Sequence, residues 1–173
     1  GIDDGSKSTE ESLEMLDMLR AQGVDTVAAT PHFYARENTP EVFLQRRTEA
    51  WNRLRPKLTA NTPRVLLGAE VHYFQGISHV DRLHELCLEG RDVLLLEMPF
   101  ASWPSRAVAE LEELAQRGDL TVVLAHIERY LSQQPRELWP QLRQLGVLFQ
   151  CNASFFLDWR TRRRAIGMLR KGE

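Results

Sequence analysis

Ionisable and amide side chains stand where short apolar runs of this sequence end. They are His32, Glu70, His72, Glu97, His126 and Asn152. If the runs are parallel strands, these residues meet at one rim, because parallel strands share the edge at which their carboxyl ends lie. Imidazole and carboxylate groups together suit manganese, iron or zinc, and coordination would satisfy a polar group at the end of a buried strand. We therefore predict a metal site on this rim.

Taken singly, each of these residues has a simpler explanation. A lone histidine at a strand end is more often a hydrogen-bonded core or rim residue than a metal ligand, and Glu70 could be a surface carboxylate or the partner of an arginine. The group is more informative than its members, because three strand ends share the same chemistry. Side chains alternate along a strand, so Glu70 and His72 also lie on the same face.

Two other features bear on the site. Residues 3–5 (Asp-Asp-Gly) precede the first expected helix and form either an ordinary Asp-Gly turn or the source of one carboxylate ligand. Arg129 follows His126 by three residues, and its planar guanidinium could bind a phosphate with two hydrogen bonds. Alternatively, Arg129 forms a surface ion pair with Glu128 or Asp119, and spacing alone does not decide between these roles.

Apolar strands alternate with helical patterns along the chain, which predicts an α/β fold with a parallel sheet buried on both faces. The strands are expected at residues 26–30, 65–73, 92–98, 121–125 and 147–151. Helices are expected between a capping box at Ser8 and a C-cap at Gly23, and at residues 40–58, 77–90, 104–117 and 135–145, with a basic helix from about residue 158.

Length and composition fit one soluble globular domain. The 173 residues suit a single sizeable core, and the net charge of -2 gives no sign of a nucleic-acid partner. No apolar stretch is long enough to cross a bilayer. No glycine-rich nucleotide-binding loop follows an expected strand, which disfavours Rossmann and P-loop folds. Cys87 and Cys151 have apolar neighbours, so we expect buried thiols in the reducing cytoplasm and no disulfide.

Four segments resemble the CpsB/CapC-type phosphatases of the polymerase-and-histidinol-phosphatase (PHP) superfamily. They are residues 3–8 (DDGSKS), 30–32 (TPH), 68–70 (GAE) and 126–130 (HIERY). The likeness runs in the same order over nearly the whole chain, and the first and last segments are its most specific parts. The resemblance implies a distorted TIM-like (β/α)7 barrel of parallel strands, with residues 1–173 forming a single PHP-type phosphoesterase domain.

By this resemblance, the rim holds up to three divalent metal ions, with manganese expected and iron or zinc as alternatives. The metal ligands would be Asp4, His32, Glu70 and His126. Glu70 would bridge two ions and, with His126 and Arg129, form the catalytic centre in which an activated water attacks phosphorus. Arg129 would contact the substrate phosphate. His72 would bind substrate, or replace a missing ligand, if its side chain points into the site.

The function implied by the resemblance is removal of phosphate from tyrosines of a protein, with a polysaccharide-export tyrosine kinase as the partner. This reaction needs no cysteine nucleophile, and neither Cys87 nor Cys151 begins a Cys-x5-Arg phosphatase loop. Two alternatives stay open. One is a small-molecule phosphatase of the histidinol-phosphate kind, and the other is a PHP-like binding or regulatory module that has lost its metals.

The sequence also departs from the family pattern. The His-x-His and Asp-x-His motifs of the first and last family segments are absent, and residues 98–103 lack a further family histidine. We therefore expect a barrel that is incomplete at both ends, a metal short of a ligand, and poor turnover by this chain alone. An exposed sheet edge favours pairing between copies, so we also expect homo-oligomers.

Overall fold

The computed structural model describes residues 2–170, so Gly1 and residues 171–173 of the predicted domain lie outside it. Its strands pair in parallel throughout this range. A two-stranded sheet joins β1 (Thr26–Ala29) to β3 (Arg64–Leu67). A five-stranded sheet has the order β2 (His32–Phe33), β4 (Glu70–His72), β5 (Val93–Glu97), β6 (Thr121–Leu124) and β7 (Leu148–Phe149).

The two sheets form one continuous arc. β1 runs into β2, and β3 runs into β4, each through a two-residue bend. The ladder crosses both bends, because the Gly68 N–H donates to the Ala29 carbonyl over 2.9 Å and the Glu70 N–H donates to the Pro31 carbonyl over 3.0 Å. The five predicted strands therefore all occur, but with different bounds. The first was expected to stop at Pro31 and instead resumes beyond it as β2, and the second is bent between β3 and β4. The arc does not close on itself within residues 2–170.

The bend between β3 and β4 is tightly enclosed. A Cβ atom at Gly68 would lie 2.9 Å from Leu88 Cδ2 and 3.2 Å from Thr30 Cγ2, so a larger residue would displace its neighbours. Arg47 Nη1 donates to the Gly68 carbonyl over 2.8 Å. These contacts fix the level at which β4 begins, and β4 carries Glu70 into the site.

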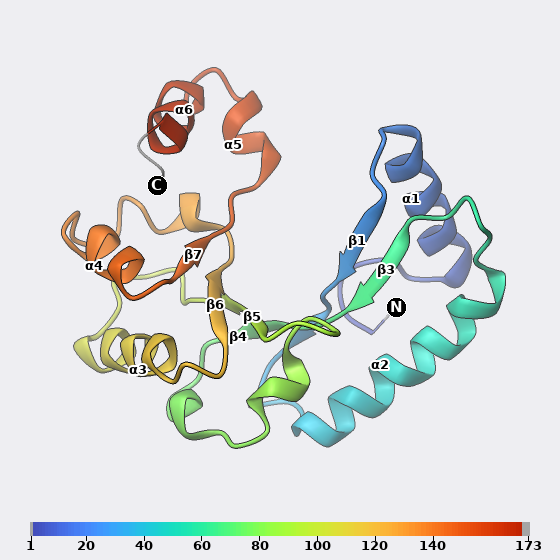
Figure 1. Cartoon of the computed structure of the whole chain (residues 1–173), viewed down its shortest axis with the longest axis horizontal. Coiled ribbons are helices and arrows are strands. Elements are labelled where there is room, and N and C mark those ends of the chain that lie inside the picture. The colour runs from blue at the N-terminus through green and yellow to red at the C-terminus, as the bar shows by residue number, and fades with distance from the viewer. Residues whose placement is uncertain (1, 171–173) are drawn as a thin grey trace.

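Helices cover the outside of the arc. They are α1 (Thr9–Ala21), α2 (Pro40–Leu54), α3 (Ser105–Gln116), α4 (Leu138–Gln144), α5 (Ala153–Leu157) and α6 (Arg162–Arg170). Figure 1 shows α1 and α2 beside the β1–β3 pair, and α3 and α4 at the other end of the arc. The core lies around the central strands, where Val71, Leu94, Leu96 and Leu124 are fully buried. None of the described helices combines the length and apolar character needed to cross a membrane.

The first predicted helix is confirmed in detail. Ser8 Oγ accepts the Glu11 N–H over 3.0 Å, and the Glu11 carboxylate reaches back to accept the N–H of Lys7, one residue before the cap, over 2.7 Å. Gly23, at the other end, has a left-handed φ of +85°. An L-residue with a side chain would be strained there, which explains the glycine.

Two predicted helices are wrong in extent. Residues 77–90 hold only the short 3-10 helices Ile77–His79 and Leu83–Leu86, because the backbone at Val80 is extended. Buried Ile77 and Leu83 are six residues apart, which is not the spacing of one helical face. The basic helix expected from about residue 158 begins only at Arg162, as α6, and the short apolar helix α5 before it was not predicted; extended backbone at Asp158 ends α5.

Candidate metal and phosphate site

Two of the predicted ligands, both histidines, converge at the rim of the arc on one carboxylate oxygen of a third predicted ligand, Glu70. His126 Nε2 lies 3.0 Å from Glu70 Oε1, and His32 Nδ1 lies 3.9 Å from the same atom. Glu70 is buried, with 8% of its surface exposed. The three residues come from β4, from the loop after β6 and from β2, so the sheet register itself brings them together.

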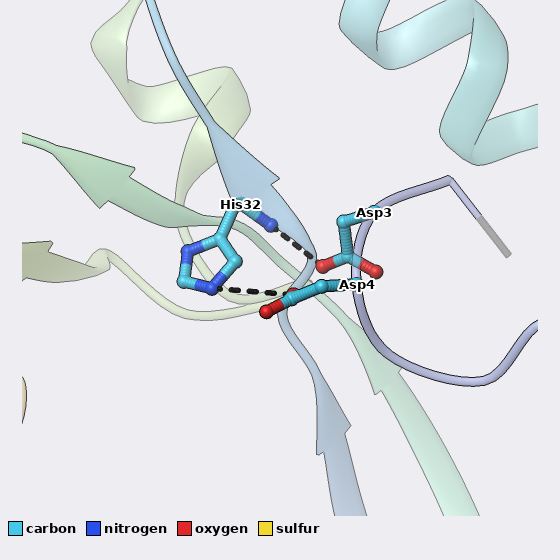
Figure 2. A group of neighbouring side chains, drawn as sticks. All are labelled: Asp3, Asp4 and His32. Carbon is cyan, nitrogen blue, oxygen red and sulfur yellow. Dashed lines mark hydrogen bonds and ion pairs between the residues drawn. The ribbon is translucent and has the colours of Figure 1, made fainter.

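The N-terminal segment adds two aspartates to this group. Figure 2 shows Asp3 and Asp4 beside His32. The His32 N–H donates to Asp3 Oδ2 over 3.0 Å, and His32 Nε2 lies 3.6 Å from Asp4 Oδ1. Asp3 also accepts the Gly5 N–H over 3.0 Å, so the predicted Asp-Gly turn and the carboxylate beside the site exist together. Asp4 therefore stands where the sequence placed it.

A second group of contacts is built around Glu97 at the end of β5. Arg129 Nη1 donates to Glu97 Oε1 over 3.0 Å, and His72 Nδ1 lies 3.2 Å from Glu97 Oε2. Neither of the ion pairs considered for Arg129 from the sequence forms, since the partner of Asp119 is Arg117. The hydrogen bond from His72 lowers the pKa of Glu97 against the opposing effect of burial, so Glu97 stays ionised.

The loop after β6 holds His126 in a strained conformation. Among residues 2–170, His126 is the one non-glycine residue with a positive φ, at 55°. Its N–H donates to Gln150 Oε1 over 2.7 Å, which fixes the backbone against β7. Such strain costs about 1–3 kcal/mol and is typical of functional sites. The loop therefore gives up stability to direct the imidazole toward Glu70.

One aromatic side chain, that of Tyr34, lies beside two of the imidazoles. The Tyr34 ring lies 5.5 Å from the His32 ring and 5.4 Å from the His72 ring, measured between centroids. Burial raises the pKa of Tyr34, and the carboxylates of Glu97 and Asp4 raise it further, so this hydroxyl stays protonated. A pocket of about 280 Å³ opens at this point, with Asp4, His32 and Tyr34 in its wall.

The donor atoms fit a divalent cation. Two groups each have ligand atoms within 4.8 Å of one another, and they are Asp3 with Asp4 and His32, and His32 with Glu70 and Glu97. Within residues 2–170, the buried Nδ1 atoms of His32 and His126 have no hydrogen-bond partner. A buried polar atom of this kind is unfavourable unless a ligand satisfies it. Carboxylate oxygens and imidazole nitrogens form a donor set that suits manganese, iron or zinc.

Some participants were missed or placed differently by sequence reasoning. Glu97 ends an apolar strand as Glu70 does, but its link to Arg129 depends on the fold. Asp3 and Tyr34 had weaker signals, namely a neighbouring aspartate and an aromatic residue two positions after His32. Asn152, also expected at the rim, bonds to Glu128, since its Nδ2 donates to Glu128 Oε1 over 2.7 Å.

The sequence is similar to those of two streptococcal phosphatases. The tyrosine-protein phosphatase CpsB of Streptococcus agalactiae serotype III (strain NEM316) is 28% identical over 160 residues, covering 90% of this chain and 65% of that protein. The tyrosine-protein phosphatase CpsB of Streptococcus pneumoniae is 30% identical over 136 residues, covering 75% of this chain and 53% of that protein. The chain thus spans less than two thirds of the length of these relatives.

The chain also resembles a solved structure and matches a family model. A chain from the crystal structures of YwqE from Bacillus subtilis and CpsB from Streptococcus pneumoniae, described as unique metal-dependent tyrosine phosphatases, has a TM-score of 0.78. It is 22% identical, and the match covers 98% of this chain and 70% of that chain. This likeness confirms the predicted fold class. The model of the family "Capsular polysaccharide synthesis, CpsB/CapC" matches residues 1–159, so the chain belongs to the CpsB/CapC family.

Proposed function

We propose that this chain is the PHP-type phosphoesterase domain of a metal-dependent phosphatase that acts on phosphotyrosine in a protein. The observation that carries the proposal is the convergence of His32 and His126 on one oxygen of Glu70, beside an arginine that retains unused donors. Membership of the CpsB/CapC family supports it, since relatives in that family are named tyrosine-protein phosphatases.

Asp4, His32, Glu70 and His126 would hold the metal, with Glu70 shared between ions. Asp3 and Glu97 are further carboxylate donors in the same groups. Manganese is the expected ion and iron or zinc the alternatives, with up to three ions in the complete family site. When bound, such cations supply Lewis acidity for phosphoryl oxygens and lower the pKa of a water molecule.

The protein's own residues would position the phosphate. Arg129 would bind its oxygens and stabilise the charge that develops on them. Glu97 fixes the guanidinium through Nη1, and this contact leaves the remaining side-chain N–H groups for the substrate. His72 shares Glu97 with Arg129 and is half-exposed, so it would face the substrate side of the site.

Cysteine chemistry is a poor fit to this chain. Burial raises the pKa of both Cys87 and Cys151 to about 11, so both thiols stay protonated near neutral pH and are weak nucleophiles. Both cysteines are free, which fits a protein of the reducing cytoplasm. The proposed partner, from the family resemblance, is a tyrosine kinase of polysaccharide export.

The test is the metal content of the purified protein, measured by elemental mass spectrometry. We expect near-stoichiometric manganese, iron or zinc in the wild-type chain, and its loss in Glu70→Ala. Glu49→Ala removes an exposed carboxylate from α2 and should leave the metal content unchanged. A wild-type chain that takes up no metal from manganese-containing buffer would contradict the proposal.

Substrate assays then separate the alternatives. Manganese-dependent hydrolysis of a phosphotyrosyl peptide, faster than that of histidinol phosphate, would support the protein phosphatase. The reverse preference would identify a small-molecule phosphatase. Metal binding with hydrolysis of neither substrate would favour a binding or regulatory module.

A further inference from the structure

Phe100 is a large aromatic side chain exposed on a well-packed part of the molecule. It is 58% exposed, whereas Met98 and Trp103 in the same loop are 0% and 6% exposed. The loop leads from β5, which ends at Glu97, to α3. Aromatic side chains that remain exposed beside a site are frequent contact residues, because burying them against a ligand is strongly favourable.

The loop on either side of Phe100 is fixed by hydrogen bonds from buried groups. The Met98 N–H donates to the Tyr130 hydroxyl over 3.1 Å, and Gln134 Nε2 donates to the Ala101 carbonyl over 2.8 Å. Tyr130 and Gln134 are both buried. The backbone that carries the Phe100 ring is therefore ordered in advance, which reduces the entropy lost when a ligand packs against it.

The exposed ring lies beside the guanidinium proposed to bind phosphate. Arg129 Cζ is 4.9 Å from the centroid of the Phe100 ring, a cation–π contact. On its other side, Arg129 Nη1 donates to Glu97, and within residues 2–170 this is the one side-chain hydrogen bond that Arg129 makes. A phosphate bound by the remaining N–H groups would therefore lie close to the Phe100 ring.

We propose that Phe100 packs against the aromatic ring of a substrate whose phosphate Arg129 holds, and so selects aryl phosphates over alkyl phosphates. This inference rests on the proposed phosphatase function and assigns it a specificity-determining residue. In an aryl phosphate a single oxygen joins phosphorus to the ring, so the ring lies near the groups that bind the phosphate. Aromatic rings pair favourably at centroid distances of about 4.5–7 Å. The methylene of a phosphoserine offers no such ring.

The experiment is equilibrium binding of three probes that the proposed phosphatase cannot hydrolyse to the manganese-loaded protein by calorimetry: inorganic phosphate, ethylphosphonate and phenylphosphonate. The wild-type protein should bind phenylphosphonate about tenfold more tightly than ethylphosphonate. Phe100→Leu keeps apolar cover over the loop but removes the ring, and should abolish that preference. Its affinity for inorganic phosphate should change by less than about twofold. Phe100→Trp should retain the preference.

A matched control removes another exposed apolar side chain. Leu157 is 81% exposed, and Leu157→Ala should alter none of the three affinities. An unchanged preference in Phe100→Leu would overturn the inference. So would an equal loss of all three probes, because Phe100 would then act only by positioning Arg129. If the wild-type protein binds no probe at all, the proposed function fails as well, whereas phosphate binding without aryl preference removes only the role of Phe100.

Discussion

Two strand pairs of the arc share the same backbone ladder and differ in burial. β1 pairs with β3, and β5 pairs with β6, through four parallel register pairs each. Three of the five β5 residues are buried, whereas β1 alternates between exposed and half-buried residues. Hydrogen bonding alone therefore does not produce a well-packed region, and the difference lies in the apolar cover.

The covering helices show the same contrast. α3 buries Ala107, Glu110, Leu111 and Leu114, whereas α1 buries only Leu16. Met15 and Met18 of α1 are 48% and 64% exposed. A largely apolar pocket of about 340 Å³ lies among α1, α2, β1 and β3. The first region thus forms a dense core, and the second leaves apolar surface in contact with water.

The candidate site lies across the boundary between these regions. Asp3 and Asp4 precede α1 on the loosely covered side, and His32 lies on β2, one bend beyond β1, whereas Glu70 and Glu97 come from the dense core. Chemical groups on a stable framework are thereby combined with groups on a less stable one. Ligand binding at this boundary would stabilise the weaker region at the expense of binding energy.

The largest expected effect breaks the dense region. Leu96→Ala removes a side chain that is 0% exposed in β5, and should lower the free energy of unfolding by about 3–5 kcal/mol. Val27→Ala in β1, whose side chain is half-buried, should cost about 1 kcal/mol. Urea denaturation of both variants measures the contrast. Equal losses would show that the two regions are packed alike.

The second effect concerns metal. Manganese at a hundred times its dissociation constant should stabilise the protein by about 2.7 kcal/mol. Because Asp4 belongs to the weaker region and His32 is joined to it through β1, hydrogen exchange should slow more in β1 and β2 than in β5. Glu70→Ala should remove both effects, and Glu49→Ala should remove neither. Uniform protection across the whole sheet would argue against a site at the boundary.

The smallest expected effect is a loss of stability at high pH caused by buried thiols, and it should be larger for Cys87 in the core than for the half-buried Cys151. Folding raises the pKa of Cys87 from 9.0 to about 11, so between these values the unfolded state loses a proton that the folded state keeps. Stability therefore falls as pH rises from 9 to 11, by at most about 1.4 kcal/mol per pH unit for this group.

Urea denaturation at pH 8 and pH 10 tests that sign. The wild-type protein should lose more stability between the two pH values than Cys87→Ala does, and comparison with the variant cancels the other titrating groups. Cys151→Ala should show the same sign with a smaller difference, because water reaches this half-buried thiol. Parallel losses in wild type and Cys87→Ala would show that folding does not disfavour the Cys87 thiolate.

The sequence predicted the strands and the meeting of His32, Glu70 and His126 because both follow from local patterns. Apolar runs identify strands, and polar residues at their ends must share a rim once the strands are parallel. The bends did not follow, since the one at Gly68 depends on contacts with Thr30 and Leu88, which are distant in sequence. The single helix predicted for residues 77–90 is wrong for another reason: the segment is rich in leucine, but its apolar residues do not follow the spacing of a helix throughout.

The structure gives the positions of the site residues, whereas their roles in binding are predicted. The structure places His126 against Glu70, and Arg129 against Glu97, but metal and phosphate binding by these groups remain predictions. The rim position of Glu97 was predicted, but its contacts with His72 and Arg129 were not, because the choice of partner among rim side chains depends on how each side chain is oriented in the folded sheet. The homo-oligomer expected from an exposed sheet edge also remains a prediction.

The left-handed backbone of His126 has a consequence for protein engineering. Glycine adopts this conformation without penalty, so a redesign that selects only for thermal stability would replace His126 by glycine. Such a variant would keep the turn and the hydrogen bond to Gln150, and would relieve the backbone strain. It would also discard the imidazole beside Glu70. Stability screens of this family should therefore hold position 126 constant, or they will select well-folded proteins that have lost part of the site.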